Sequence, residues 1–255
     1  MYILPSASLK RQVQVELYLP PDFRKESSYP LLIVNDGQDM VRLGMRKILE
    51  YLYAQQMIQP VIIAAVHAGD RLHEYGTAAE LDYLKRGNKA GQYVEFVIQN
   101  LLEDLHSRLE VEFSIKAIAG FSLGGLSALD IAWNYPHLFK GCGVFSGSLW
   151  WRKKRFNPLF PDSYRIIHDI IENGHRRPGM RFWFQCGTED ETEDRNNNGI
   201  IDSIDDTLDL IKILKAKGYT YPGDIYYHEI LGGRHDVYTW SLSMPAFLKW
   251  MFPSR

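Results

Sequence analysis

The chain has 255 residues, of which 45% are hydrophobic and 13% aromatic, so it can bury a sizeable core and is not expected to be disordered. Its 29 lysines and arginines nearly balance 31 aspartates and glutamates, and a net charge of -2 gives no reason to expect nucleic-acid binding. No stretch approaches the roughly 18 apolar residues of a membrane span, and no signal-peptide pattern opens the chain. Cys142 and Cys186 each lie in an apolar strand-like segment, which predicts buried free thiols and a cytoplasmic protein.

Strand-like and helix-like segments alternate along most of the chain. Residues 12–19 alternate polar and apolar side chains, as a half-buried strand does. Short apolar runs predict further strands at residues 31–34, 61–66, 117–119, 182–184 and 225–231. Helical spacing predicts helices at residues 41–55, 91–109, 126–134, 164–171, 204–216 and 245–251. This alternation predicts an α/β fold with one open, mostly parallel sheet, an antiparallel edge and helices on both faces. Because no linker or repeat divides the chain, we expect a single domain over residues 1–255.

The segment Gly120-Phe121-Ser122-Leu123-Gly124-Gly125 has the pattern of a nucleophile elbow. By itself G-x-S-x-G occurs by chance in roughly one chain in ten of this length. Here it lies between an apolar strand-like run and a helical stretch, which is the strand-turn-helix context that the elbow requires. The small flanking glycines permit so sharp a turn and expose the hydroxyl to a base. Ser122 is therefore the predicted nucleophile.

A serine nucleophile needs a histidine base and an acid that orients it. In α/β hydrolases the acid and then the histidine follow the serine in the chain. His235 lies in a glycine-rich loop after the strand predicted at residues 225–231, so it is the predicted base. His67 also ends a strand, but it precedes Ser122 and breaks that order.

Three adjacent carboxylates, residues 189–191, follow the strand that contains Cys186. Asp190 is favoured as the acid and Glu189 is the nearest alternative, while a solvated acidic loop would explain the same residues without catalysis. An oxyanion hole would take the backbone N–H of Leu123, next after the nucleophile, and that of Gln38, after an early strand. An ordinary turn at Gln38 is the other interpretation.

Six segments spread over most of the chain carry a resemblance to a known family. They are Tyr29-Pro30 with Asn35-Asp36-Gly37-Gln38, Arg71-Leu72-His73-Glu74-Tyr75, the elbow, Ser146-Gly147-Ser148-Leu149-Trp150-Trp151, Cys186-Gly187-Thr188-Glu189-Asp190 and Gly233-Arg234-His235-Asp236. Together they resemble the putative esterase family, which includes esterase D, enterochelin esterases and bacterial feruloyl esterase domains. The resemblance implies an α/β-hydrolase fold with Ser122, His235 and Asp190 as triad and the Gln38 and Leu123 N–H groups as oxyanion hole. Many relatives carry a histidine before the early glycine, whereas Asp36 here is more similar to the enterochelin esterase branch.

A second motif lies in the acid loop. Residues 194–205 have the spacing of an EF-hand loop, with glycine at position 6 and Asp205 in place of the usual glutamate at position 12. The predicted ligands of a structural calcium ion are Asp194, Asn196, Asn198, Ile200, Asp202 and Asp205. An Asn- and Gly-rich turn before a helix, without metal, is the alternative.

Four further residues are predicted to line the substrate pocket, although simple packing would also explain them: Arg71, Tyr75, Trp150 and Trp151. The sequence thus predicts a serine carboxylic-ester hydrolase that works through an acyl-enzyme. Its substrate would be a small, sugar-linked, aromatic or siderophore-type ester, with no catalytic cofactor and no nucleic-acid or membrane partner. Two alternatives are an acyltransferase of the same fold and a catalytically inactive, calcium-dependent binding module. The sequence predicts no oligomeric state.

Overall fold

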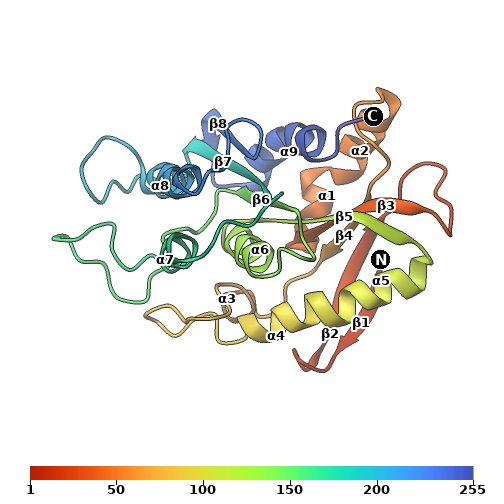
Figure 1. Ribbon diagram of the computed structural model, residues 1–255, viewed down its shortest axis with the longest axis horizontal. Coiled ribbons are helices and arrows are strands. Elements are labelled where there is room, and N and C mark those ends of the chain that lie inside the picture. The colour runs from red at the N-terminus through yellow and green to blue at the C-terminus, as the bar shows by residue number, and fades with distance from the viewer. Residues whose placement is uncertain (255) are drawn as a thin grey trace.

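The computed structural model describes residues 1–254, which form one eight-stranded sheet in the order β1-β2-β4-β3-β5-β6-β7-β8 (Figure 1). The strands are β1 (Tyr2–Ser6), β2 (Arg11–Tyr18), β3 (Ser28–Asn35), β4 (Ile62–Val66), β5 (Glu112–Phe121), β6 (Gly141–Phe145), β7 (Arg181–Glu189) and β8 (Ile225–Arg234). Strand β2 pairs antiparallel with β1 and β4, and every other pairing in the sheet is parallel. The mostly parallel sheet with an antiparallel edge is therefore confirmed.

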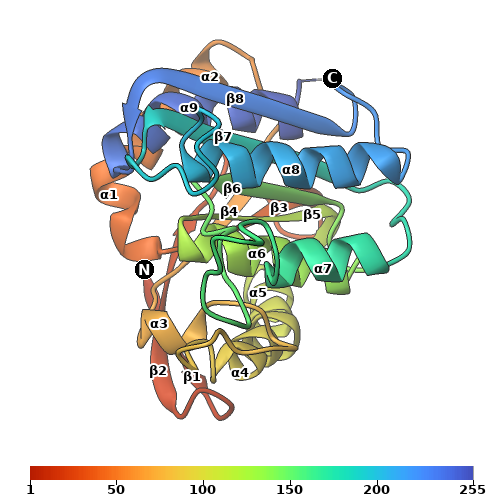
Figure 2. The ribbon, with the colours of Figure 1, turned by 90° about the vertical axis from the view of Figure 1, so that its left-hand side faces the viewer.

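Helices cover both faces of this sheet, as predicted (Figure 2). Helices α4, α5, α6, α7 and α8 pack on one face, and α1, α2 and α9 on the other. Their bounds are α1 (Met40–Leu43), α2 (Met45–Ala54), α3 (Arg71–Glu74), α4 (Ala90–Glu95), α5 (Leu102–Leu109), α6 (Leu123–Asn134), α7 (Ile166–Asn173), α8 (Asp202–Ala216) and α9 (Val237–Met251). A 3-10 turn, η1 (Gly37–Asp39), precedes α1, and a π-helical segment, η2 (Phe96–Leu101), joins α4 to α5.

Some element boundaries differ from those that the sequence predicts. The helix predicted at residues 41–55 is interrupted at Gly44, whose φ of 76° lies in the left-handed region. Helix α9 begins at Val237, well before Pro245, because the Asp236 side chain caps it by accepting the Thr239 N–H at 2.8 Å. Strand β1 was not predicted, because it is a short edge strand with a half-exposed pattern.

The parallel strands deliver the loops that follow β3 to β8 to one end of the sheet. The long loops after β6 and β7 project side by side from that end (Figure 1), where Arg195 and Asp162 form an ion pair at 2.8 Å. Both cysteines are buried free thiols, as predicted. Within residues 1–254, no helix is long and apolar enough to cross a membrane.

The turn after β5 tolerates only glycine at Gly120. A Cβ there would lie 2.3 Å from the Gly124 carbonyl oxygen, which is backbone and has no room to move. We therefore expect Gly120→Ala to lower the free energy of unfolding by at least about 2 kcal/mol, measured by urea denaturation. The control is Gly91→Ala on α4, where nothing lies within 4 Å of the added methyl group and a gain of about 0.5–1 kcal/mol is expected. Equal effects at the two sites would contradict the crowded turn.

Candidate active site

Ser122 stands at the turn between β5 and α6, in a strained backbone conformation with φ 52° and ψ -119°. Two hydrogen bonds hold this conformation: the Ser122 N–H donates to the Phe145 carbonyl at 2.8 Å, and the Ser122 carbonyl accepts the Ser148 N–H at 3.1 Å. The Ser122 hydroxyl lies 3.2 Å from the Ser148 hydroxyl. The sheet thus fixes the predicted nucleophile from below and leaves its hydroxyl at the sheet edge.

The three residues of the predicted triad line one cavity of about 340 Å³ at this edge. Ser122 comes from the elbow, Asp190 from the loop after β7, and His235 from the loop between β8 and α9. Glu189, the alternative acid, is instead exposed and pairs with Arg234 at 3.1 Å. The remaining residues of the cavity wall are Ser146, Gly147, Ser148, Trp150, Glu191 and Ser203.

Asp190 is 9% exposed, and only one of its carboxylate oxygens has a partner within the described chain. Oδ2 accepts the Gly187 N–H at 3.1 Å, whereas the buried Oδ1 accepts no hydrogen bond. Burial raises the pKa of Asp190, and the Gly187 N–H, the Ser146 hydroxyl and His235 oppose that rise. An imidazole N–H of His235 is the natural donor for Oδ1, because it lies in the same cavity.

The His235 ring packs edge-on against Trp240, with centroids 5.5 Å apart, and Trp240 Nε1 donates to the Ser146 hydroxyl at 3.0 Å. Partial burial lowers the pKa of His235, while the Asp190 carboxylate opposes the drop. The ring is therefore neutral near pH 7, as a general base must be. Within residues 1–254, no hydrogen bond joins His235 to Ser122 or Asp190. Such contacts often tighten only when substrate binds.

The two predicted oxyanion donors stand at the starts of helical segments. Leu123 is the first residue of α6 and Gln38 lies in η1, so their N–H groups belong to first turns, which lack intrahelical acceptors. Gly37 packs directly on β4, because a Cβ there would lie 2.8 Å from the Ala65 carbonyl oxygen and from the His67 ring. His67, the alternative base, therefore supports this loop from outside the cavity.

A buried ion pair joins the η1 loop to the elbow. The Asp36 carboxylate accepts Nε and Nη2 of Arg71 at 2.8 and 3.0 Å, and the same Nη2 donates to the Phe121 carbonyl at 3.0 Å. The Tyr75 hydroxyl accepts the Asp36 N–H at 3.0 Å. Tyr75, predicted to contact substrate, is fully buried beneath the loop, and Arg71 is held by Asp36 with about a third of its side chain exposed.

Of the two tryptophans predicted in the pocket, only Trp150 lines the cavity. Trp151 is 1% exposed and packs against the loop glycines Gly76 and Gly87. The Arg86 guanidinium lies over its ring, 4.7 Å from the ring centroid. Its place is in the core beneath the loop after β4.

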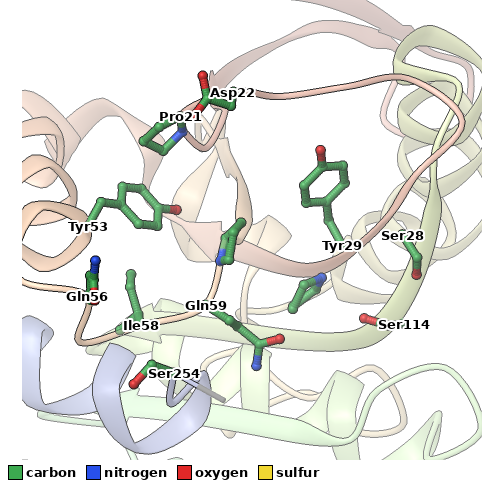
Figure 3. A pocket seen from close by; sticks show the side chains of 12 residues that line it. Pro21, Asp22, Ser28, Tyr29, Tyr53, Gln56, Ile58, Gln59, Ser114 and Ser254 are labelled. Atoms are coloured by element: carbon green, nitrogen blue, oxygen red, sulfur yellow. The ribbon is translucent and has the colours of Figure 1, made fainter.

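A larger hollow of about 950 Å³ lies at the opposite end of the sheet, where β3 begins (Figure 3). Tyr29 and Tyr53 line it, but both hydroxyls already have backbone partners, at Arg24 and Val61. No histidine is among its lining residues within 1–254, so the smaller cavity is the candidate site.

In the predicted calcium loop, the Asp194 carboxylate accepts the Asn198 and Gly199 N–H groups at 3.1 and 2.8 Å. Gly199, at loop position 6, has a φ of 83°. Three further side chains bond within the loop: Asn196 Nδ2 donates to Asp205, and the Asn196 and Asn198 amide oxygens accept loop N–H groups. The Ile200 N–H is bound by Asn198, which leaves the Ile200 carbonyl as its candidate ligand atom.

The side chain of Arg195 points into the predicted calcium loop, which the sequence analysis did not predict. Its guanidinium, 4% exposed, contacts Asp202 at 3.1 Å and Asp205 at 3.3 Å, so two predicted calcium ligands are already paired with a cation. It also reaches Asp162 and Asp206. The sequence motif gives no sign of this inward-pointing side chain.

Five cavity residues escaped the sequence analysis as site residues: Ser146, Gly147, Ser148, Glu191 and Ser203. The Ser146-Gly147-Ser148 segment after β6 was the available signal for the first three. Glu191 adjoins the predicted acid, and Ser203 lies next to the predicted calcium ligand Asp202. Burial raises the pKa of Glu191 to about 7.

Comparison with known proteins places this chain in a family. The family described as "Putative esterase" matches residues 6–251, nearly the whole chain. The chain belongs to this family. Protein YbbA of Bacillus subtilis is 25% identical over 212 residues, which cover 80% of this chain and 78% of YbbA.

The solved structures that this esterase resembles have the same fold. The enterobactin esterase FES of Shigella flexneri, solved in the presence of enterobactin, has a TM-score of 0.76 at 21% identity. The match covers 97% of this chain but only 57% of that enzyme. The siderophore hydrolase EstB of Aspergillus nidulans has a TM-score of 0.70 at 16% identity. That match covers 100% of this chain and 95% of EstB.

In this esterase Arg71 affects the candidate base in two separable ways. It holds the η1 loop through Asp36, and its positive charge lowers the pKa of His235, next in size after burial and the opposing effect of Asp190. We expect Arg71→Ala to reduce kcat by about 10–100-fold and to move the acidic limb of the kcat/KM pH profile to higher pH. Arg71→Lys keeps the charge, so it should reduce kcat and leave the limb in place.

Arg42→Ala is the matched control, since Arg42 is 72% exposed and pairs with Asp39 just after the same loop. Arg42→Ala should change neither kcat nor the position of the acidic limb. A purely structural role for Arg71 would lower stability without moving the acidic limb, and that result would contradict the electrostatic half of the prediction.

Proposed function

We propose that this member of the esterase family is a serine carboxylic-ester hydrolase that works through an acyl-enzyme. One observation carries the proposal: Ser122, Asp190 and His235, which are far apart in sequence, line the same cavity at the carboxyl end of the sheet. The strained backbone of the elbow supports it.

The proposed mechanism assigns one role to each residue. His235 removes the proton from Ser122 as its oxygen attacks the ester carbonyl, and Asp190 holds the ring and stabilises the imidazolium. The Leu123 and Gln38 N–H groups stabilise the oxyanion. His235 then protonates the leaving alcohol and activates the water that releases the acid.

The proposed substrate is a small-molecule ester of the sugar-linked, aromatic or siderophore type. Trp150 gives the cavity one aromatic wall, and a volume of about 340 Å³ suits a small ligand. Two similar structures are described as acting on enterobactin or siderophores, which supports the siderophore type. Acyl transfer to an alcohol is the second candidate, because an acceptor alcohol could replace water at the same acyl-enzyme.

Removal of the nucleophile is the direct test. We expect Ser122→Ala to lower kcat/KM for p-nitrophenyl and feruloyl esters by at least about a thousandfold, with circular dichroism showing a folded protein. Ser241→Ala, which changes a half-buried serine on α9 outside the cavity lining, should keep full activity. Wild type should react with a fluorophosphonate probe, and Ser122→Ala should not.

Two outcomes would redirect the proposal. Equal rates in wild type and Ser122→Ala would remove Ser122 as nucleophile, and a folded wild type that is neither labelled nor active would favour the non-catalytic binding module. Ester products that form from added acceptor alcohols would favour the acyltransferase.

We also propose that the loop of residues 194–205 binds a structural calcium ion that braces the segment carrying Asp190. Support comes from the EF-hand spacing and the left-handed Gly199, which turn several oxygens toward the loop interior. Arg195 competes for Asp202 and Asp205, so a bound ion would have to share or displace its contacts. The ion has no step in the proposed chemistry.

Chelation tests the calcium proposal. If calcium at about a hundredfold its Kd stabilises the fold, EGTA should lower the melting temperature by roughly 5–10 °C. Asp194→Asn should remove that dependence, because it weakens the first ligand at matched size. Magnesium is the control ion. An unchanged melting temperature together with no heat of binding in titration calorimetry would mean that Arg195 alone neutralises the loop.

A further inference from the structure

Besides Asp190, two side chains in the wall of the catalytic cavity have polar atoms that bond to nothing in the described chain. They are Oε1 of Glu191 and Oγ of Ser203, and both atoms are buried. Ser203 is 7% exposed, in the first turn of α8, and Glu191 is half-buried on the loop after β7. Buried polar atoms without partners cost about 1–3 kcal/mol each, so they are uncommon where no ligand or water satisfies them.

The two residues that carry these atoms line the same cavity as Ser122. The unpaired Oδ1 of Asp190 has an obvious partner in His235 on the proposed mechanism, but Glu191 and Ser203 have no role in it. Their position in the wall places them within the space that a bound ester would fill. What they offer is a carboxylate oxygen, which accepts hydrogen bonds, and a hydroxyl, which accepts or donates.

The surrounding charge restricts which substrate group would suit them. Arg195 pairs with Asp202 and Asp206, so Glu191 and Glu193 are the nearby carboxyl groups that have no cationic partner in the described chain. A second anion beside them is disfavoured, and a plain alkyl group would leave both polar atoms unsatisfied. A hydrogen-bond donor, neutral or positively charged, would satisfy both.

We propose that Glu191 and Ser203 form a specificity subsite that accepts a hydrogen-bond donor, a hydroxyl or an ammonium group, carried by the ester near its scissile bond. This inference rests on the proposed ester hydrolysis in the same cavity and names a feature of its substrate. Glu191 is the principal acceptor, and Ser203 completes the contact from α8.

The test compares matched esters that differ in one group. The probes are p-nitrophenyl butyrate and its β-hydroxy and β-amino counterparts, and propyl butyrate with its hydroxyl-terminated and amino-terminated counterparts. Wild type should prefer a donor-bearing ester, by kcat/KM, by about tenfold or more over the plain one in at least one series. Glu191→Gln should abolish most of that preference, because it should lower kcat/KM for the donor-bearing ester by a larger factor than kcat/KM for the plain ester. A preference confined to the hydroxyl or to the amino probes identifies the group.

Ser203→Ala is the second variant, and it should reduce the same preference less strongly. Glu172→Gln, which removes an exposed charge on α7, is the matched control and should leave the preference unchanged. No preference in wild type, or a preference that survives both Glu191→Gln and Ser203→Ala, overturns the subsite. Failure of the proposed function looks different, because wild type would then hydrolyse none of the esters and escape fluorophosphonate labelling.

Discussion

The bidentate pair between Asp36 and Arg71 is the interaction on which the candidate site depends. Asp36 is 2% exposed, and an unpaired carboxylate at that depth would be strongly destabilising. Arg71 neutralises it and, through the same Nη2 atom, binds the Phe121 carbonyl just before the elbow serine. One guanidinium therefore joins the loops after three strands, β3, β4 and β5. The positions of both predicted oxyanion donors follow from it, because Gln38 and Leu123 are each two residues beyond its anchors.

A second chain of hydrogen bonds supports the elbow from the side of α4. The Tyr93 hydroxyl donates to Asn35 Oδ1 at 2.6 Å, and Asn35 Nδ2 donates to the Gly124 carbonyl in the first turn of α6. These groups are buried and mutually satisfied, as a rigid scaffold requires. By contrast, Glu191 and Ser203 line the cavity with unsatisfied atoms. The network beneath Ser122 thus serves geometry, and the wall formed by the loop after β7 and α8 is where substrate selection can act.

Much of this arrangement could be predicted from sequence, because its signals are local. The strand periodicity and the glycines around Ser122 depend on neighbouring residues, and the predicted sheet was confirmed. Side-chain direction depends on partners far away in the chain. Arg71 and Tyr75 lie in the expected loop, yet they contact Asp36, which precedes them by more than thirty residues. Trp151 points inward because Gly76 and Gly87, which have no side chains, leave room for its ring. Arg195 points inward because the acids of α8 attract its guanidinium.

The charges around the cavity are arranged asymmetrically. Arg71, a cation, stands on the side of the η1 loop, whereas Asp190, Glu191 and the acids near the start of α8 stand on the other. On the proposed mechanism negative charge develops on the ester oxygen beside η1, and positive charge develops on His235 beside Asp190. Arg71 is held by hydrogen bonds to Asp36 and to the Phe121 carbonyl, so on the proposed mechanism its contribution to the field needs no rearrangement, and Asp36 cancels part of its charge. On the same proposal, the ion pair at the η1 loop acts on the electrostatics of the site as well as on its geometry.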